Sequence, residues 1–132
     1  MSDLAALVRH PRWWWMPGML DSSGLRILSA HEGRAVYVHD HGVPGAERPA
    51  FGWIAVEGLR APIPSDPATF GCLCALAAEL HNAPDSYVAL SNITGWTYFV
   101  IGAYNEQGAV VTKMFHGDSR EDAACKAILG AP

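Results

Sequence analysis

His39, Asp40 and His41 are the residues of this sequence best suited to metal chemistry. In a strand, residues 39 and 41 point to the same face, so their two imidazoles could bind one metal ion. Asp40 or His31 would supply a third ligand if the preceding hairpin folds back. An exposed strand end that leads into a loop explains the same residues without a metal. Because two histidines without a dependable third ligand do not define a site, we predict no metal site and no cofactor.

The sequence contains none of the common catalytic motifs. There is no G-x-S-x-G elbow, no G-x-x-x-x-G-K-[ST] phosphate loop and no G-x-G-x-x-G. Cys125 lies inside a predicted helix, which is a poor place for a nucleophile. Glu121 and Asp122 are better explained as favourable charges at a helix start. We therefore name no catalytic residue, and an enzyme that uses His39–His41 with a metal is the alternative function.

Three of the five tryptophans are consecutive and follow an arginine. Adjacent side chains cannot all face inward in regular structure, so at least one of the three indoles should be partly exposed. Exposed Trp beside Arg is typical of interface hot spots. We therefore predict a partner-binding site made of Arg12, Trp13, Trp14 and Trp15. The alternative interpretation is that these indoles close one face of a sheet, with nearby methionines filling the gaps.

The composition is that of a folded globular domain. The chain has 132 residues, of which 50% are hydrophobic and 17% are charged. These values exclude a disordered chain and suit one domain with one core. The formal net charge of −4 argues against a protein that binds nucleic acid or anionic membranes, because such a protein needs a basic patch.

The targeting features and the cysteines favour the cytoplasm. No apolar run reaches the ~18–20 residues of a transmembrane helix, and no basic stretch followed by an apolar one predicts a signal peptide. The chain has an odd number of cysteines, namely Cys72, Cys74 and Cys125. An odd number is typical of reduced thiols in a cytosolic protein. We therefore expect a cytoplasmic protein without a membrane segment.

Hydrophobic periodicity and turn residues predict alternating groups of strands and helices. The predicted strands lie at 25–29, 35–39, 51–57, 86–91, 96–104 and 109–115, and the two main helices lie at about 66–82 and 119–129. Short loops that contain glycine join neighbouring strands, which indicates hairpins. We therefore predict the α+β class, with a mostly antiparallel sheet of about five to six strands. The two main helices should pack on this sheet, after a short N-terminal helix.

We expect a single domain over residues 1–132. Within it, residues 1–20 form the N-terminal helix and the Trp-rich arm, and residues 24–132 form the sheet and its helices. The strand at 96–104 has apolar residues on both faces, which predicts that it is central and covered on both faces.

Two stretches resemble proteins of phages and prophages. The stretch Asp66-Pro67-Ala68-Thr69-Phe70-Gly71-Cys72-Leu73 resembles a helix start in small proteins that open with a segment like His10-Pro11-Arg12-Trp13-Trp14-Trp15-Met16-Pro17-Gly18-Met19. The stretch from Gly117 to Ile128 is similar to the closing helix of phage ABA-sandwich domain proteins. The resemblance implies a phage or prophage accessory protein with helices packed on a sheet. It implies no activity and no catalytic residue.

These observations favour a protein that acts by binding a protein partner and not by catalysis. If it derives from a phage, it would act in the cytoplasm of the bacterial host and could interfere with a host system. Besides the metal-dependent enzyme, a structural or assembly protein that acts by self-association is an alternative. The predicted sheet has few charges on its first strands and a second apolar face, which favours a homodimer.

Overall fold

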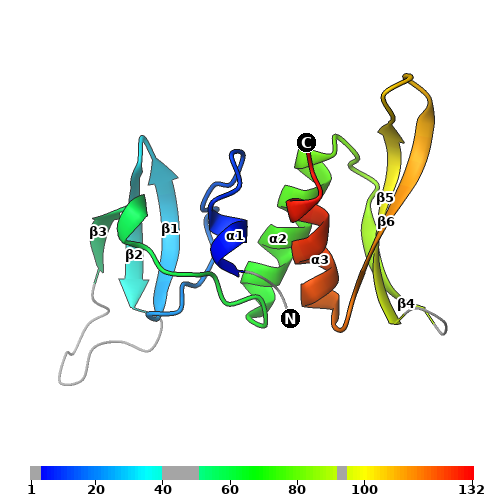
Figure 1. The fold of residues 1–132 in the computed structure, drawn as a ribbon. Coiled ribbons are helices and arrows are strands. Elements are labelled where there is room, and N and C mark those ends of the chain that lie inside the picture. Colours follow the sequence, from blue (N-terminus) through cyan, green and yellow to red (C-terminus); the bar gives the residue numbers. More distant parts are fainter. Residues whose placement is uncertain (1–3, 40–50, 92–94) are drawn as a thin grey trace. The chain divides into compact units, whose positions relative to one another are not determined.

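The computed structural model describes residues 4–39, 51–91 and 95–132, and they form an α+β protein (Figure 1). Every predicted helix and main strand is found close to its predicted position. The elements are α1 (Leu4–Val8), β1 (Leu25–His31), β2 (Arg34–His39), β3 (Phe51–Ala55), the 3-10 helix η1 (Val56–Gly58), α2 (Pro67–Leu80), β4 (Tyr87–Ser91), β5 (Gly95–Tyr104), β6 (Val110–Gly117) and α3 (Arg120–Leu129).

The prediction of a single sheet of five to six strands is wrong. The described strands form two separate antiparallel sheets of three strands each, in the orders β1-β2-β3 and β4-β5-β6. Every strand pairs only with a strand next to it in the chain. The hairpins are therefore as predicted, but no ladder joins the two groups.

One edge of the first sheet is occupied by a segment that the sequence did not identify as paired. The Gly18 amide donates to the Ile27 carbonyl at 2.8 Å, and the Ile27 amide donates to the Met19 carbonyl at 2.8 Å. The Asp21 amide donates to the Leu25 carbonyl at 3.0 Å. Because residues 18–21 use the outer backbone groups of β1, that edge cannot accept a strand from the second sheet.

The chain divides into two compact units. One unit is the continuous stretch Trp13–Cys72, which contains β1, β2, β3 and the first residues of α2. The other unit combines Met1–Arg12 with Leu73–Pro132, so it contains α1, the rest of α2, the second sheet and α3. The expectation of one domain over 1–132 stays a prediction.

In the discontinuous unit, helices cover one face of the second sheet. α3 contacts all three strands, and α1 contacts α3. The buried Tyr98 donates its phenolic hydroxyl to the Cys74 carbonyl of α2 at 2.9 Å. Leu73, Leu76 and Leu80 are also buried, and their spacing places them on one face of α2. β5 is the central strand, as predicted.

The prediction that β5 is covered on both faces is wrong. Tyr98 points to the helices, whereas its neighbour Phe99 points to the opposite face by the alternation of a strand. The cross-strand partners of Phe99 are Tyr87 and Met114, and both are exposed. No described element of this unit covers that face, because its helices lie together on the other side of the sheet (Figure 1).

His81 is a buried histidine in the same unit. Its Nε2 lies 2.7 Å from the Ala127 carbonyl and therefore donates to it. Its Nδ1 is buried and has no partner among the described residues. The ring lies 5.4 Å from the ring of Phe115. Burial lowers the pKa of His81, because the charged form would lose its hydration.

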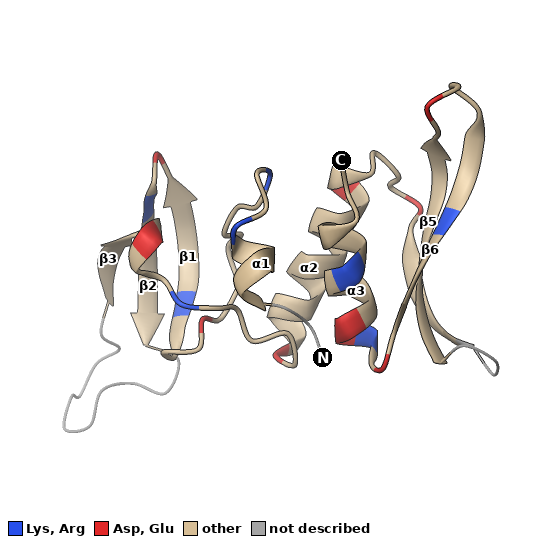
Figure 2. Ribbon diagram, viewed as in Figure 1, with Lys and Arg blue, Asp and Glu red and all other residues tan. Residues whose placement is uncertain are grey.

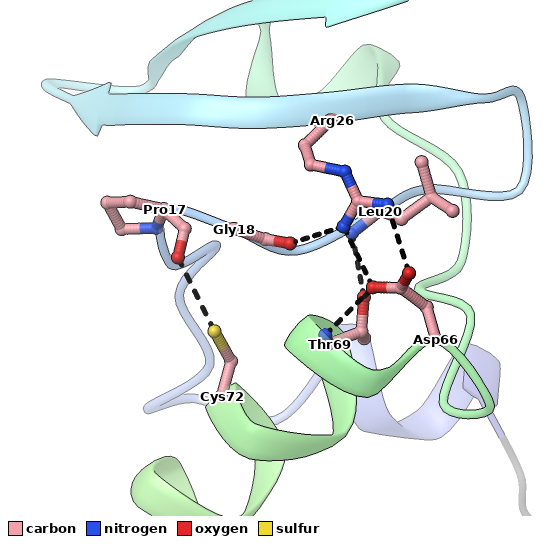
Figure 3. Close-up of polar contacts among 7 residues, drawn as sticks. All are labelled: Pro17, Gly18, Leu20, Arg26, Asp66, Thr69 and Cys72. Carbon is pink, nitrogen blue, oxygen red and sulfur yellow. Dashed lines mark hydrogen bonds and ion pairs between the residues drawn. The ribbon is translucent and has the colours of Figure 1, made fainter. Parts of the chain in front are cut away.

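In the continuous unit, a cluster of polar contacts fixes the start of α2 (Figure 3). Asp66 is the N-cap residue and Pro67 is the first helical residue, and the Thr69 amide donates to Asp66 Oδ2 at 2.9 Å. Arg26 of β1 donates to both carboxylate oxygens of Asp66, at 2.8 and 3.0 Å. These hydrogen bonds hold the pKa of Asp66 well below its usual range, although burial opposes the shift.

The same cluster also ties residues 18–20 to the helix. The Thr69 hydroxyl donates to Asp66 at 2.9 Å and accepts from the Leu20 amide at 2.8 Å. Arg26 donates a further hydrogen bond to the Gly18 carbonyl at 2.9 Å. We call Arg26, Asp66 and Thr69 the Asp66 cluster, and it joins β1, the segment before β1 and α2.

Candidate partner-binding surface

The exposed aromatic side chains of the first sheet lie together on one face. Along β3, Phe51 and Trp53 point to the same side because side chains alternate in a strand. The ladder pairs Trp53 with Val36, and it pairs Phe51 with Val38 of β2. Paired residues point to the same face. Phe51 is 66% exposed and Trp53 is 63% exposed, so two large aromatic groups face solvent side by side.

The opposite face of these strands is the inner one. A Cβ atom on Gly52 would lie 2.6 Å from the Tyr37 hydroxyl oxygen, which shows that the Tyr37 side chain lies across Gly52. On the same side, Ala35 is fully buried beside its ladder partner Ile54. Alternation along the sequence separates the two faces of β3. Because both faces are apolar, alternation does not show which of them is buried.

Arg34 adds a positive charge at the edge of the aromatic face. Its guanidinium carbon lies 4.8 Å from the centre of the Trp53 ring, which is a cation–π contact. Arg34 is the first residue of β2, where Figure 2 shows a basic band. We call Arg34, Val36, Phe51 and Trp53 the Trp53 face. It combines Trp and Arg with flanking apolar side chains, the composition typical of binding hot spots, and none of its members is a nucleophile.

The four residues predicted as a partner-binding site belong to two different units. Arg12 lies in the discontinuous unit, where its guanidinium donates to the Leu80 carbonyl at 3.0 Å. Trp13, Trp14 and Trp15 begin the continuous unit. The three indoles therefore belong to one unit, whereas the Arg12 side chain is hydrogen-bonded to the end of α2 in the other unit.

The three indoles differ in exposure, as three adjacent side chains must. Trp14 is 42% exposed, whereas Trp15 is buried and lies edge-on against Trp13 with ring centres 5.6 Å apart. Trp13 is half-buried, and its Nε1 is buried without a hydrogen-bond partner among the described residues. Trp14 is thus the member of this group that a partner could reach. A binding role for Arg12 and the three tryptophans stays a prediction.

The metal candidates are only partly described. His39 ends β2, and its ring lies edge-on to Tyr37 with centres 5.6 Å apart. Asp40 and His41 lie outside the described residues. Over residues 4–39, 51–91 and 95–132, no three His, Cys, Asp or Glu side chains are grouped to hold a metal ion. A metal site at residues 39–41 therefore stays untested, as does the absence of one.

The comparisons with known proteins give no family for this chain. No protein-family model, no curated protein and no solved structure matches it. The resemblance to phage ABA-sandwich proteins therefore stays a prediction. In the part of the chain that the structure describes, no helix is both long and apolar enough to cross a bilayer.

Cys72 and Cys74 show no sign of activation as nucleophiles. Both are half-buried in α2, whereas Cys125 is buried in α3. Burial raises the pKa of Cys74 to about 11 and also raises the pKa of Cys72. A thiol with a raised pKa stays protonated at neutral pH, and the thiolate is the reactive form. Cys72 and Cys74 therefore suit a structural role in α2.

Proposed function

We propose that the protein acts by binding a partner protein on the Trp53 face and catalyses no reaction. The observation that supports this function is the exposure of Phe51 and Trp53 next to each other, with Arg34 stacked on Trp53. Exposing such large aromatic groups is unfavourable unless another surface covers them. Trp and Arg are also the residues that most often dominate binding energy.

The chemistry of this face defines the partner. Val36, Phe51 and Trp53 suit an apolar surface on the partner, and a carboxylate beside that surface would form a charge-assisted pair with Arg34. The resemblance to phage and prophage proteins supports a protein of the bacterial host as this partner. Interference with the function of that host protein is the biological role that we propose.

Affinity capture from a bacterial host lysate tests the proposal, with the tagged full chain as bait. The wild-type chain and the Trp53→Ala, Arg34→Ala and Leu90→Ala variants are compared. Leu90 is the matched control, because it is as exposed as Trp53 but lies on the other sheet. We expect one protein to be retained by the wild type and by Leu90→Ala, and to be lost with Trp53→Ala.

The captured protein is then purified and its affinity is measured by calorimetry. Trp53→Ala should weaken binding by at least ~2 kcal/mol, the loss typical of a hot-spot tryptophan. Arg34→Ala should weaken it less and should reduce its dependence on salt. A Trp14→Ala variant measures whether the Trp-rich segment contributes. If Trp53→Ala binds as tightly as the wild type, the Trp53 face is not the binding surface.

A further inference from the structure

The second sheet also has an uncovered apolar face. Tyr98 and Phe115 contact the helices, so their neighbours along the strands point away from them. Phe99 stacks on Tyr87 with ring centres 5.2 Å apart, and the ladder pairs Phe99 with Met114 on its other side. These three side chains form a row across β4, β5 and β6.

The apolar row continues toward the hairpin that joins β5 and β6. A bulge between Val100 and Ala103 inserts one residue into β5, and Gly102 takes a φ of +81° there. Beyond the bulge, Tyr104 pairs with Val110, and both are exposed. The extra residue keeps this pair on the side of Phe99. We call Tyr87, Phe99, Met114, Tyr104 and Val110 the Met114 face.

The exposed area of this face suits a small interface that forms reversibly. Tyr87, Met114, Tyr104 and Val110 are each between 53% and 64% exposed. With ~150–250 Å² on an aromatic side chain, these four residues expose roughly 400 Å². That value is comparable with the largest apolar patches of monomers, which are often functional. It is also about half of the ~800 Å² that each partner buries in a standard interface.

The lack of charge on the Met114 face favours the same face of a second copy as its occupant. None of the residues named in the Met114 face is charged, and the charges on this sheet are sparse (Figure 2). Lys113 pairs with the buried Val100, so it belongs to the opposite face. The whole chain has a formal net charge of −4. Two copies repel each other least where they meet through uncharged surfaces.

We infer that the protein forms a homodimer in which two Met114 faces pack against each other. In such a contact a two-fold axis runs parallel to β5, which places Phe99 near Phe99 of the second copy. The same axis exchanges the edge strands, so Tyr87 lies opposite Met114 of the second copy. A Met sulfur next to an aromatic ring is a favourable contact. This dimer does not depend on the proposed function, which uses the first sheet.

Sedimentation velocity of the full chain tests the dimer with charged variants at the two facing positions. The variants are Tyr87→Lys and Met114→Glu, measured alone and as an equimolar mixture. Each variant alone would bury two unpaired charges in its own dimer, which is costly. In the mixture, one Lys faces one Glu, and the other facing pair is the original Tyr and Met. Trp53→Glu is the matched control on the first sheet.

We expect the wild type and Trp53→Glu to sediment as dimers. Each single variant should dissociate at least tenfold more readily than the wild type, and the mixture should recover the dimer. A wild type that stays monomeric up to its solubility limit would overturn the inference. A dimer that is lost with Trp53→Glu but kept with Met114→Glu, or a mixture that stays monomeric, would also overturn it. Thermal melts followed by circular dichroism verify that each variant is folded.

Discussion

Replacing Asp66 should destabilise the Trp13–Cys72 unit through the loss of two separable contributions, the N-cap of α2 and the ion pair with Arg26. Asp66→Ala removes the N-cap acceptor of α2 and both hydrogen bonds from Arg26. Loss of an N-cap costs about 1 kcal/mol. The side chains of Arg26 and Asp66 are 22% and 14% exposed. Breaking an ion pair costs ~0–1 kcal/mol of stability at the surface and ~3–5 kcal/mol when the pair is buried, and we expect an intermediate cost here. We expect a total loss of about 2–3 kcal/mol for Asp66→Ala.

Asp66→Asn separates the two contributions. Asparagine keeps an N-cap acceptor but lacks the charge that pairs with Arg26, so we expect a loss of about 1–2 kcal/mol. Ser65→Ala is the control, because Ser65 is the exposed neighbour and caps nothing. Its free energy of unfolding should stay within ~0.5 kcal/mol of the wild type.

The effect of Asp66 should also depend on pH. Its pKa is lowered in the folded state, whereas an unfolded Asp titrates near ~3.9. The stabilisation by the carboxylate is therefore complete above about pH 5 and is lost as the pH falls through ~3.9 toward the lowered folded pKa. At pH 3 the difference between the wild type and Asp66→Asn should be about 1 kcal/mol smaller than at pH 7.

Urea unfolding followed by circular dichroism measures these differences at both pH values. The wild type, the two Asp66 variants and Ser65→Ala are unfolded under identical conditions. If Asp66→Asn is as stable as the wild type at pH 7, the Arg26–Asp66 pair contributes nothing. If Asp66→Ala and Asp66→Asn lower the free energy of unfolding by the same amount, the N-cap makes no separate contribution.

Further measurements test other parts of the molecule. Leu76→Ala should cost ~2–5 kcal/mol in urea melts, because Leu76 is fully buried, and a loss below ~1 kcal/mol would contradict this burial. Since the pKa of His81 is lowered from 6.5 in the folded state, the unfolded state takes up a proton at a higher pH than the folded state does. The free energy of unfolding should therefore fall as the pH drops below about 6.5, until the folded pKa is passed, and His81→Gln should flatten that slope between pH 7.5 and 5. Trp14 should be quenched by iodide, so Trp14→Ala should remove part of the quenchable fluorescence, and the exposed Trp53 should account for much of what remains. Elemental analysis of the purified chain should find no stoichiometric zinc, and one zinc per chain that disappears with His39→Ala and His41→Ala would support the metal-dependent enzyme.

The helices and strands were predictable because their signals are local. Asp66 and Pro67 mark the start of α2, and Ser119 caps α3 through the Asp122 amide. The turn at Glu32 and Gly33 has positive φ at both residues, which suits the short hairpin that the glycine predicted. Each of these features depends on residues within a few positions of one another.

The grouping of the strands was not predictable in the same way. Strand pairing between distant segments has no local pattern. The edge of the first sheet is occupied by residues 18–21 through backbone hydrogen bonds. The sequence Pro17-Gly18-Met19 has no hydrophobic periodicity that would predict this pairing. The binding surface shows a similar limit. Trp53 and Ile54 belong to two apolar faces of one strand, and it is the burial of Ala35, the ladder partner of Ile54, that identifies the inner face.

The contact between α1 and α3 has a consequence for synthesis of the chain. Leu7 is fully buried, and His10 Nε2 lies 3.3 Å from the Ala131 carbonyl, 121 positions away. Residues 4–8 leave the ribosome well before α3, so α1 has no packing partner while the residues between the two helices are being synthesised. The continuous unit Trp13–Cys72 has all its residues available much sooner. A nascent chain that stalls before residue 120 would therefore contain one complete unit and an exposed apolar helix, a state that chaperones and proteases recognise.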